Sequence, residues 1–298
     1  MKIAYLDCPS GISGDMTLGA LVDAGVSLDA LNEAVGSLGL PGCRLVAMEV
    51  TKKGFRATQI TVEYKPEHAH RHLSDILKMI EGGKLTAKQK NLASKIFRRL
   101  AEAEAKVHGC AIEKVHFHEV GAADSIADIV GSAVAWDLLG AERIVASPVP
   151  TGMGKVRIAH GTCGIPAPAT AELLRGIPLA ESSIKAELTT PTGAAILATL
   201  VDEFGPLPAM TVERIGHGAG ERDLEEQPNM LRLFVGTASE KIEADNSDEA
   251  ECCWILETNL DDISGELIAY CARRLREAGA LDVFTTAVAM KKNRPGVV

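Results

Sequence analysis

The sequence has little of what nucleic-acid-binding and membrane proteins depend on. Only 4% of its 298 residues are aromatic, and 40 acidic side chains outnumber 31 basic ones, for a formal charge of −9. Few aromatic rings leave few platforms on which bases could stack, and an acidic surface repels a phosphate backbone. No apolar run approaches the roughly 20 residues that span a bilayer. We expect no nucleic-acid partner and no membrane partner.

Cysteines are also few and irregularly placed. There are seven, an odd number, and no two are spaced as C-x-x-C. This pattern argues against a disulfide framework and against a thiolate zinc site. The N-terminus is short, only briefly apolar and patterned like a strand rather than like a signal peptide. These features predict a cytoplasmic protein in a reducing compartment.

The chain does have alternating strand-like and helix-like segments. Residues 2–7 predict a buried strand that leads through a glycine-rich turn into a helix, and residues 44–64 predict a hairpin around Lys53 and Gly54. Further helices are expected at 27–40, 73–81, 86–108, 124–139 and 192–205, and further strands at 115–117, 143–149, 210–220 and 229–238. The order favours an α/β to α+β fold, a mixed sheet with flanking helices.

A change in composition divides the chain. Residues 239–251 hold six acidic residues and one lysine, as in a linker. Residues 1–238 would form a large domain, and residues 252–298 a strand, helix and strand, an incomplete βαβ unit resembling half of a ferredoxin-like domain. Such a unit exposes a sheet edge. We therefore expect a homo-oligomer, or association with a further C-terminal chain.

The segment HFHEVGAADSIADIVG, residues 116–131, concentrates metal-ligand chemistry. If the chain is extended there, His116 and His118 share a face, and Asp124 and Asp128 lie one turn apart on the helix that follows. With Glu119, these groups suit a borderline divalent ion such as nickel, zinc or manganese. Alternatively, Asp124 only complements a helix N-terminus and the histidines are ordinary buried polar groups.

A second histidine segment, HAHRH, precedes it. An extended chain would place His68, His70 and His72 on one face, and a helix would bring His68 and His72 together. Both arrangements can hold a metal in transit. The alternative is an exposed polar loop after Pro66.

Two predicted helix starts suit an anion. In SGISGDM, Ser10, Gly11, Ser13 and Gly14 lie between a strand and a helix, where backbone N–H groups and the helix dipole attract phosphate. Asp7 and Asp15 there could hold magnesium or manganese beside the phosphate, or Asp15 could only cap the helix.

TTPTGAAIL offers a second such start, and two further candidates stand alone. Thr190, Thr192 and Gly193 supply hydroxyl and backbone donors before an apolar helix. GHGAGERD adds Arg222 and His217 among permissive small residues, and His160 stands apart in AHGTCGIPAP. Taken singly, each is more often a cap or a turn than a site.

Several of these segments together resemble the LarC family across essentially the whole chain: DCPSGISGDM, HAHRHLSDI, VHFHEVGAADSIADIVG, HGTCGIPAPAT, TPTGAA and GAGERDLEEQPN, in that order. The resemblance implies a nickel chelatase or cyclometallase of the lyase class. It would insert nickel into pyridinium-3,5-bisthiocarboxylic acid mononucleotide, consuming CTP with magnesium or manganese, to make the nickel-pincer cofactor of lactate racemase.

On that basis each candidate residue receives a role. We expect nickel ligands among His68, His70, His72, His116, His118, Asp124 and Asp128. Asp7, Asp15 and Glu119 would be catalytic, and the phosphate would bind near Ser10, Gly11, Ser13, Gly14, Thr190, Thr192, Gly193 and Arg222.

One departure from the family concerns the end of the chain. Family members continue past KKNRPG, and their C-terminal domain carries the CTP site, so we expect either a truncated or frameshifted reading or a second chain that supplies the remainder. Two alternative functions stay open: a nickel carrier without turnover, and a metal-dependent phosphohydrolase using Asp7, Asp15 and the histidines.

Overall fold

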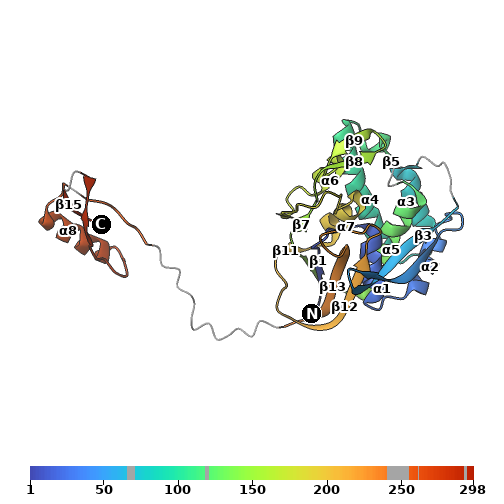
Figure 1. The fold of residues 1–298 in the computed structure, drawn as a ribbon, viewed down its shortest axis with the longest axis horizontal. Helices are drawn as coiled ribbons and strands as arrows, with labels where there is room; N and C mark the ends of the chain where they lie inside the picture. The colour runs from blue at the N-terminus through green and yellow to red at the C-terminus, as the bar shows by residue number, and fades with distance from the viewer. Residues whose placement is uncertain (66–70, 118–120, 240–254, 261, 292–293) are drawn as a thin grey trace. The chain divides into compact units, whose positions relative to one another are not determined.

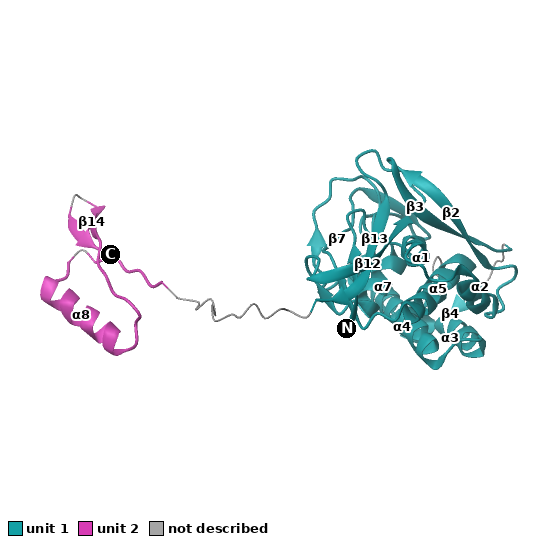
Figure 2. Ribbon diagram, turned by 90° about the horizontal axis from the view of Figure 1, so that it is seen from below, with its two compact units in different colours: residues 1–241 teal, residues 242–298 magenta. Residues whose placement is uncertain are grey.

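The computed structural model describes residues 1–65, 71–117, 121–239, 255–260, 262–291 and 294–298 (Figure 1). The chain divides into two compact units, Met1–Lys241 and Ile242–Val298, which Figure 2 shows in separate colours. Most of the acidic stretch expected at 239–251 lies outside the described residues, so its role as a linker, and the roles of the two predicted domains, stay predictions.

The larger unit is built on a seven-stranded mixed sheet. Its order is β11-β6-β1-β13-β12-β3-β2. The strands are β1 (Lys2–Asp7), β2 (Arg44–Lys52), β3 (Phe55–Glu63), β6 (Arg143–Ala146), β11 (Glu203–Phe204), β12 (Met210–Ala219) and β13 (Met230–Ala238). Strand β1 runs parallel to β6 and antiparallel to β13. The expected mixed sheet with flanking helices is confirmed.

Helices and small two-stranded sheets complete this unit. The helices are α1 (Gly14–Asp23), α2 (Leu28–Gly36), α3 (Leu73–Gly82), α4 (Ala87–His108), α5 (Ala123–Leu139), α6 (Pro168–Leu173) and α7 (Pro191–Leu200), with a 3-10 turn, η1 (Ile112–Lys114). The small sheets pair β4 (Arg71–His72) with β5 (His116–Phe117), β7 (Val149–Pro150) with β10 (Leu179–Ala180), and β8 (Lys155–Ile158) with β9 (Gly161–Gly164).

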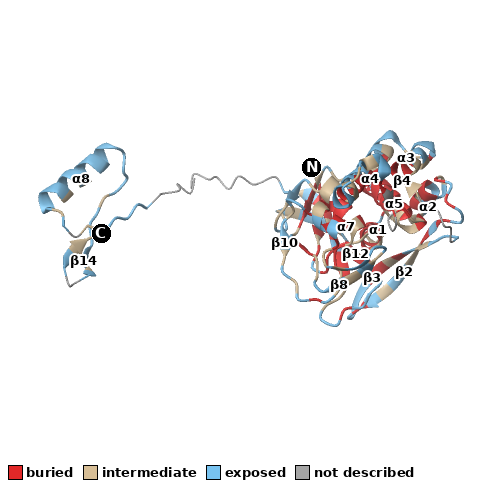
Figure 3. Ribbon diagram, turned by 90° about the horizontal axis from the view of Figure 1, so that it is seen from above, coloured by how far each residue is buried: buried red, intermediate tan, exposed pale blue. Residues whose placement is uncertain are grey.

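The main core lies between one face of the sheet and the helices. Alternate residues of β1 point to opposite faces: Ala4 and Leu6 enter the main core, whereas Ile3 and Tyr5 join a small cluster on the other face. Helix α1 packs on β12 and β3, and α5 packs against both α1 and α4 (Figure 2). The buried residues of this layer appear red in Figure 3.

Two glycines of β12 allow α1 to approach the sheet. A Cβ on Gly216 would lie 2.0 Å from the Ala20 carbonyl oxygen, and one on Gly218 only 1.8 Å from that of Met16. The glycines of GHGAGERD therefore serve helix–sheet packing. The His217 N–H donates to Asp23 Oδ2 over 2.8 Å, at the opposite end of α1 from the loop that precedes it.

Local features of the larger unit follow the expected turn chemistry, with one exception. Lys53 and Gly54 both have positive φ, 51° and 87°, as the tight hairpin between β2 and β3 requires. Ser27 caps α2 through an accepted hydrogen bond from the Ala30 N–H, 3.3 Å long. The strand expected over 143–149 is broken instead: β6 ends before Pro148, which has no N–H for a sheet, and β7 pairs elsewhere.

The smaller unit matches the expected strand, helix and strand only in part: the helix and a short piece of the second strand are present. It contains α8 (Gly265–Glu277), β14 (Ala287–Ala289) and β15 (Pro295–Val297), and the last two pair antiparallel. In the described part of the first predicted strand, residues 255–260, only Leu260 forms a bridge, to Val297. No residue of α8 is buried, and Leu256 is 92% exposed. Residues with a high strand propensity form a strand only where a neighbouring strand pairs with them and side chains cover one face. Residues 255–259 have no such pairing among the described residues.

Membrane-spanning helices and disulfides are both absent from the described residues. No helix there combines the length and the apolar character that crossing a bilayer requires. None of the described cysteines is in a disulfide.

Candidate functional site

The loop before α1 and the start of α7 lie side by side. The Ile12 N–H donates to the Leu188 carbonyl over 3.1 Å, and the Thr190 N–H donates to the Ile12 carbonyl over 3.1 Å. A Cβ on Gly193 would lie 2.1 Å from the Ile12 oxygen, so only glycine permits this approach. Two motifs that are far apart in the sequence thus form one surface.

Both helix starts present features that attract an anion. Thr190 caps α7, accepting from the Gly193 N–H over 3.2 Å, and Thr192 is buried behind it. Ser13 is the extended residue before α1, and its hydroxyl donates to the Asp15 carboxylate. The dipoles of two adjacent helix starts favour a phosphate or carboxylate.

Helix α5 brings two more carboxylates to the start of α1. Asp128 Oδ2 lies 2.5 Å from the position that a Cβ on Gly14 would take. The charges of Asp15 and Asp124 both act on Asp128. We call Asp15, Asp124 and Asp128 the carboxylate cluster.

The cluster is electrostatically unfavourable without a counter-charge. Burial raises the pKa of Asp128 well above its ordinary value, and the negative charges of Asp15 and Asp124 raise it further. The residue is only half-buried as a whole, but its Oδ1 is buried with no hydrogen-bond partner among the described residues. A buried polar atom without a partner costs on the order of 1–3 kcal/mol. A cation or a proton would offset that cost.

Asp15 is held differently. Burial raises its pKa, while the hydrogen bonds from the Ser13 hydroxyl and from the backbone N–H groups of Met16 and Asp15 oppose the shift. The charge of Glu221 raises the pKa further. Asp15 is therefore a positioned carboxylate that still favours a neighbouring cation.

Other predicted site residues have protein partners. Arg232 Nε donates to Asp7 Oδ2 over 2.7 Å, and the Ser10 hydroxyl donates to the Pro228 carbonyl over 2.7 Å. Gly11 has φ +76°, and its Cβ would lie 2.2 Å from the Leu188 oxygen. Arg222 is exposed, and its carbonyl accepts from Asn229 Nδ2 over 3.0 Å. The predicted ion between Asp7 and Asp15 stays a prediction.

The two histidine segments pair with each other. In the β4–β5 ladder, His72 lies opposite His116 and Arg71 opposite Phe117. His72 Nδ1 lies 3.1 Å from the Val115 carbonyl, and Arg71 donates to the Gly121 carbonyl over 2.9 Å, just before α5 begins. This ladder leads into the carboxylate-bearing helix.

The complete nickel ligand set remains a prediction. Within the described residues, no group of three or more His, Cys, Asp or Glu side chains is arranged to hold a metal ion. The predicted residues that lie outside the description are His68, His70, His118, Glu119 and the side chain of His116. A cation at the carboxylate cluster would therefore need ligands from beyond it.

Two residues near the cluster were not singled out from the sequence. The pKa of Tyr64 is raised, first by the charge of Asp124 and then by burial. Glu221 acts on Asp15, as described above. Tyr64 comes shortly before HAHRH, and Glu221 lies within GHGAGERD. Their position in or near these motifs is the sequence feature that could have identified them.

The fold and site define a mixed α/β protein in which carboxylates and helix starts from distant segments meet, as cation- and anion-handling proteins require. The chain belongs to the nickel insertion protein family, whose model matches residues 4–298. Proteins of Geobacillus kaustophilus and Desulfitobacterium hafniense, both named pyridinium-3,5-bisthiocarboxylic acid mononucleotide nickel insertion protein, are each 48% identical to it. These alignments cover 100% of this chain and 76% and 74% of theirs. No solved structure was found to match.

Proposed function

We propose that this chain inserts nickel into pyridinium-3,5-bisthiocarboxylic acid mononucleotide. Family membership supports the reaction, and the names of two relatives that are 48% identical over the whole chain support the substrate. The single structural observation that carries the proposal concerns Asp128, which lies beside Asp15 and Asp124: its Oδ1 is buried and has no hydrogen-bond partner among the described residues.

The mononucleotide phosphate would bind where the starts of α1 and α7 meet. The contact between Ile12 and Thr190 places two helix dipoles at one surface, and a phosphate there would accept from backbone N–H groups and hydroxyls. The candidate residues are Ser10, Gly11, Ser13, Gly14, Thr190, Thr192, Gly193 and Arg222. This placement orients the pyridinium ring relative to the carboxylate cluster.

Nickel, the metal substrate, would be held by oxygen and imidazole ligands that release it. Asp124 and Asp128 supply carboxylates, and the proposed imidazoles are those of His68, His70, His72, His116 and His118. Nickel prefers the softer sulfur ligands of the substrate to carboxylates. Transfer from protein to substrate is therefore favourable.

Forming a nickel–carbon bond requires that the ring carbon lose its proton. A carboxylate with a raised pKa is a suitable acceptor, because its affinity for a proton lies closer to neutral pH. Burial raises the pKa of Asp15, which lies at the start of α1. We assign this role to Asp15, and propose Asp7 and Glu119 as further catalytic residues.

The proposal also names a co-substrate, a recipient of the product and a compartment. CTP with magnesium or manganese would drive the reaction, lactate racemase apoprotein would receive the product, and the protein would act in the cytoplasm. The exposed apolar side chains of the smaller unit, Leu256 and Phe284 among them, support association with a second copy or with a further C-terminal chain.

The test supplies nickel, the mononucleotide, CTP and manganese, and measures activation of lactate racemase apoprotein. The proposal predicts activation that Asp128→Asn abolishes. Asp137→Asn is the matched control, because Asp137 lies on the same helix and pairs with Lys88 at 3.0 Å. Nickel binding without any transfer would indicate a carrier instead. Phosphate release from simple esters under manganese would indicate a phosphohydrolase.

A further inference from the structure

A second group of ionisable side chains lies outside the carboxylate cluster. His108 ends α4, and His160 lies in the turn between β8 and β9. Their ring centroids are 4.8 Å apart, with the ring planes inclined at 59°. His108 Nε2 also lies 3.4 Å from Glu104 Oε2, one turn back on α4. Segments about 50 residues apart thus bring two imidazoles into contact.

These side chains line a small cavity of about 70 Å³. Its other walls include Ala167, Pro168 and Pro191. Pro191 is the first residue of α7, whose start forms half of the proposed phosphate surface. The cavity beside the imidazole pair therefore reaches the first residue of α7, next to the proposed phosphate surface.

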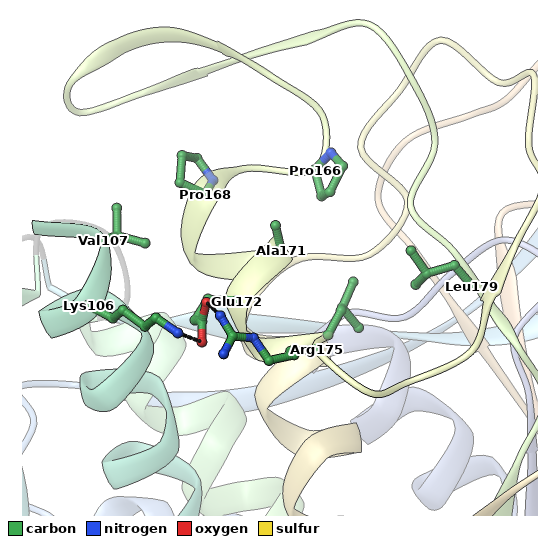
Figure 4. A pocket seen from close by; sticks show the side chains of 9 residues that line it. Lys106, Val107, Pro166, Pro168, Ala171, Glu172, Arg175 and Leu179 are labelled. Carbon is green, nitrogen blue, oxygen red and sulfur yellow. Dashed lines mark hydrogen bonds and ion pairs between the residues drawn. The ribbon is translucent and has the colours of Figure 1, made fainter.

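A larger, open cavity of about 570 Å³ adjoins it, sharing Val107 and Pro168 (Figure 4). Its charged residues satisfy one another. Lys106 and Arg175 both reach Glu172, at 2.8 Å and 2.9 Å. Ion pairs therefore occupy the charged side chains of this cavity, whereas the smaller cavity is lined by two imidazoles, which are common nickel ligands.

We propose that His108 and His160 form a nickel-loading site, which holds the ion before it passes to the mononucleotide. This deepens the proposed function and rests on it. Two observations support this assignment: the rings of the two histidines are in contact although they are far apart in the sequence, and a cavity lies beside them.

The ring geometry fits one shared ion. A metal–nitrogen bond to imidazole is about 2.1 Å long, which puts the ring centroid about 3.2 Å from the metal. Two imidazoles bound at roughly right angles then have centroids about 4.5–5 Å apart. The observed separation of 4.8 Å lies in that range.

A site with only two protein ligands suits an ion that is passed on rather than one that is stored. Two protein ligands leave the remaining coordination positions to water or to an incoming donor, so exchange is easy. Glu104 is a positioning residue, because a carboxylate beside a ligating imidazole fixes its orientation. Imidazole favours nickel over the harder magnesium ion, which separates this site from any magnesium used with CTP.

The test is equilibrium dialysis of the whole chain with Ni²⁺ alone. His108→Gln and His160→Gln are each expected to weaken one nickel site roughly tenfold or more, and the double variant should be little worse, because both changes remove the same ion. Nickel K-edge absorption should lose imidazole scattering in each variant. Glu104→Gln is expected to weaken the same site less.

His217→Gln is the matched control, because that imidazole lies beside Asp23 on another element. Wild-type nickel affinity and imidazole scattering in both folded variants would overturn the loading site. Insertion that is intact in these variants but lost in Asp128→Asn would leave the proposed function standing. No insertion by the wild-type chain, with nickel still lost from the pair variants, would overturn the function alone.

Discussion

The Asp128 carboxylate fills the space that a side chain on Gly14 would need. Its Oδ2 lies 2.5 Å from the Cβ position of that glycine, so the two residues are in direct contact although 114 positions separate them. The contact joins the phosphate-type loop to the carboxylate-bearing helix. It makes one site of two motifs that, in the sequence, suggest two.

Replacing Asp128 with asparagine should stabilise the metal-free protein while abolishing insertion. Asparagine keeps the shape but removes a carboxylate that burial and two neighbouring charges disfavour. We expect a gain of about 1–3 kcal/mol at neutral pH, since a buried charge without a counter-charge costs more than a neutral amide of the same shape. Thermal unfolding measures it. Equal or lower stability of the variant would contradict the electrostatic description of the cluster.

The stability difference between Asp128→Asn and the wild-type protein should depend on pH, and the raised pKa of Asp128 fixes the direction. A carboxyl whose pKa is raised in the folded state binds its proton more tightly there than in the unfolded chain. The stability it contributes is complete below the ordinary carboxyl pKa of about 4 and is lost as pH rises through the raised pKa of Asp128. The advantage of Asp128→Asn should therefore grow with pH. An advantage that stayed constant across acidic and neutral pH would contradict the shift.

A methyl group on Gly14 should disrupt the site, whereas one on Gly36 should not. Gly14→Ala puts a Cβ 2.5 Å from Asp128 Oδ2, but a Cβ on Gly36 meets nothing within 4 Å. We expect the first variant to lose about 1–3 kcal/mol and most insertion activity. The second should be unchanged or gain up to about 1 kcal/mol. Chemical denaturation and the racemase activation assay distinguish them.

Two threonine caps separate a structural effect from a binding effect. Thr190 caps α7 at the proposed phosphate surface, and Thr86 caps α4 elsewhere, accepting from the Gln89 N–H at 3.2 Å. Replacing either with alanine should cost about 0.5–2 kcal/mol. Only Thr190→Ala should also weaken binding of the mononucleotide, measured by calorimetry. Equal affinity in the two variants would move the phosphate away from α7.

Cysteine chemistry should be absent from the site. Burial, and then the charge of Asp7, raise the pKa of Cys8 to about 12, so the thiol stays protonated at pH 8. Iodoacetamide at that pH should label exposed Cys271 and leave Cys8 unmodified until the protein unfolds. Mass spectrometry of the labelled peptides reads the result. Rapid labelling of Cys8 in the native chain would show that the thiol is accessible.

Much of the larger unit could be predicted because its signals are local. Strand β1, the hairpin around Lys53 and Gly54, and the helix that begins after Ser27 each depend on residues within a few positions. Strand pairing in the smaller unit could not, because it depends on which neighbour covers an edge. Strand β14, which lies within the strand expected after α8, pairs with β15 near the end of the chain rather than with a strand before α8.

The candidate residues of the site could be predicted from the sequence, but their arrangement in space could not. The residue types at Asp15 and Asp128 indicated ligand chemistry, but only the packing of α5 on α1 brings them together. The glycines at 216 and 218 suggested a ligand approach, whereas a neighbouring helix backbone fills that space. Glycine spacing alone cannot distinguish a ligand from a packed helix, since both need the same missing side chain.

The most direct test of the carboxylate cluster is a double-mutant cycle on the rate of nickel insertion, with Asp15→Asn, Asp128→Asn and the pair. If the two carboxylates serve one reaction centre, each single variant should be slowed roughly 100-fold or more, and the double variant should be little slower than either. Wild-type insertion rates in both single variants would contradict the account.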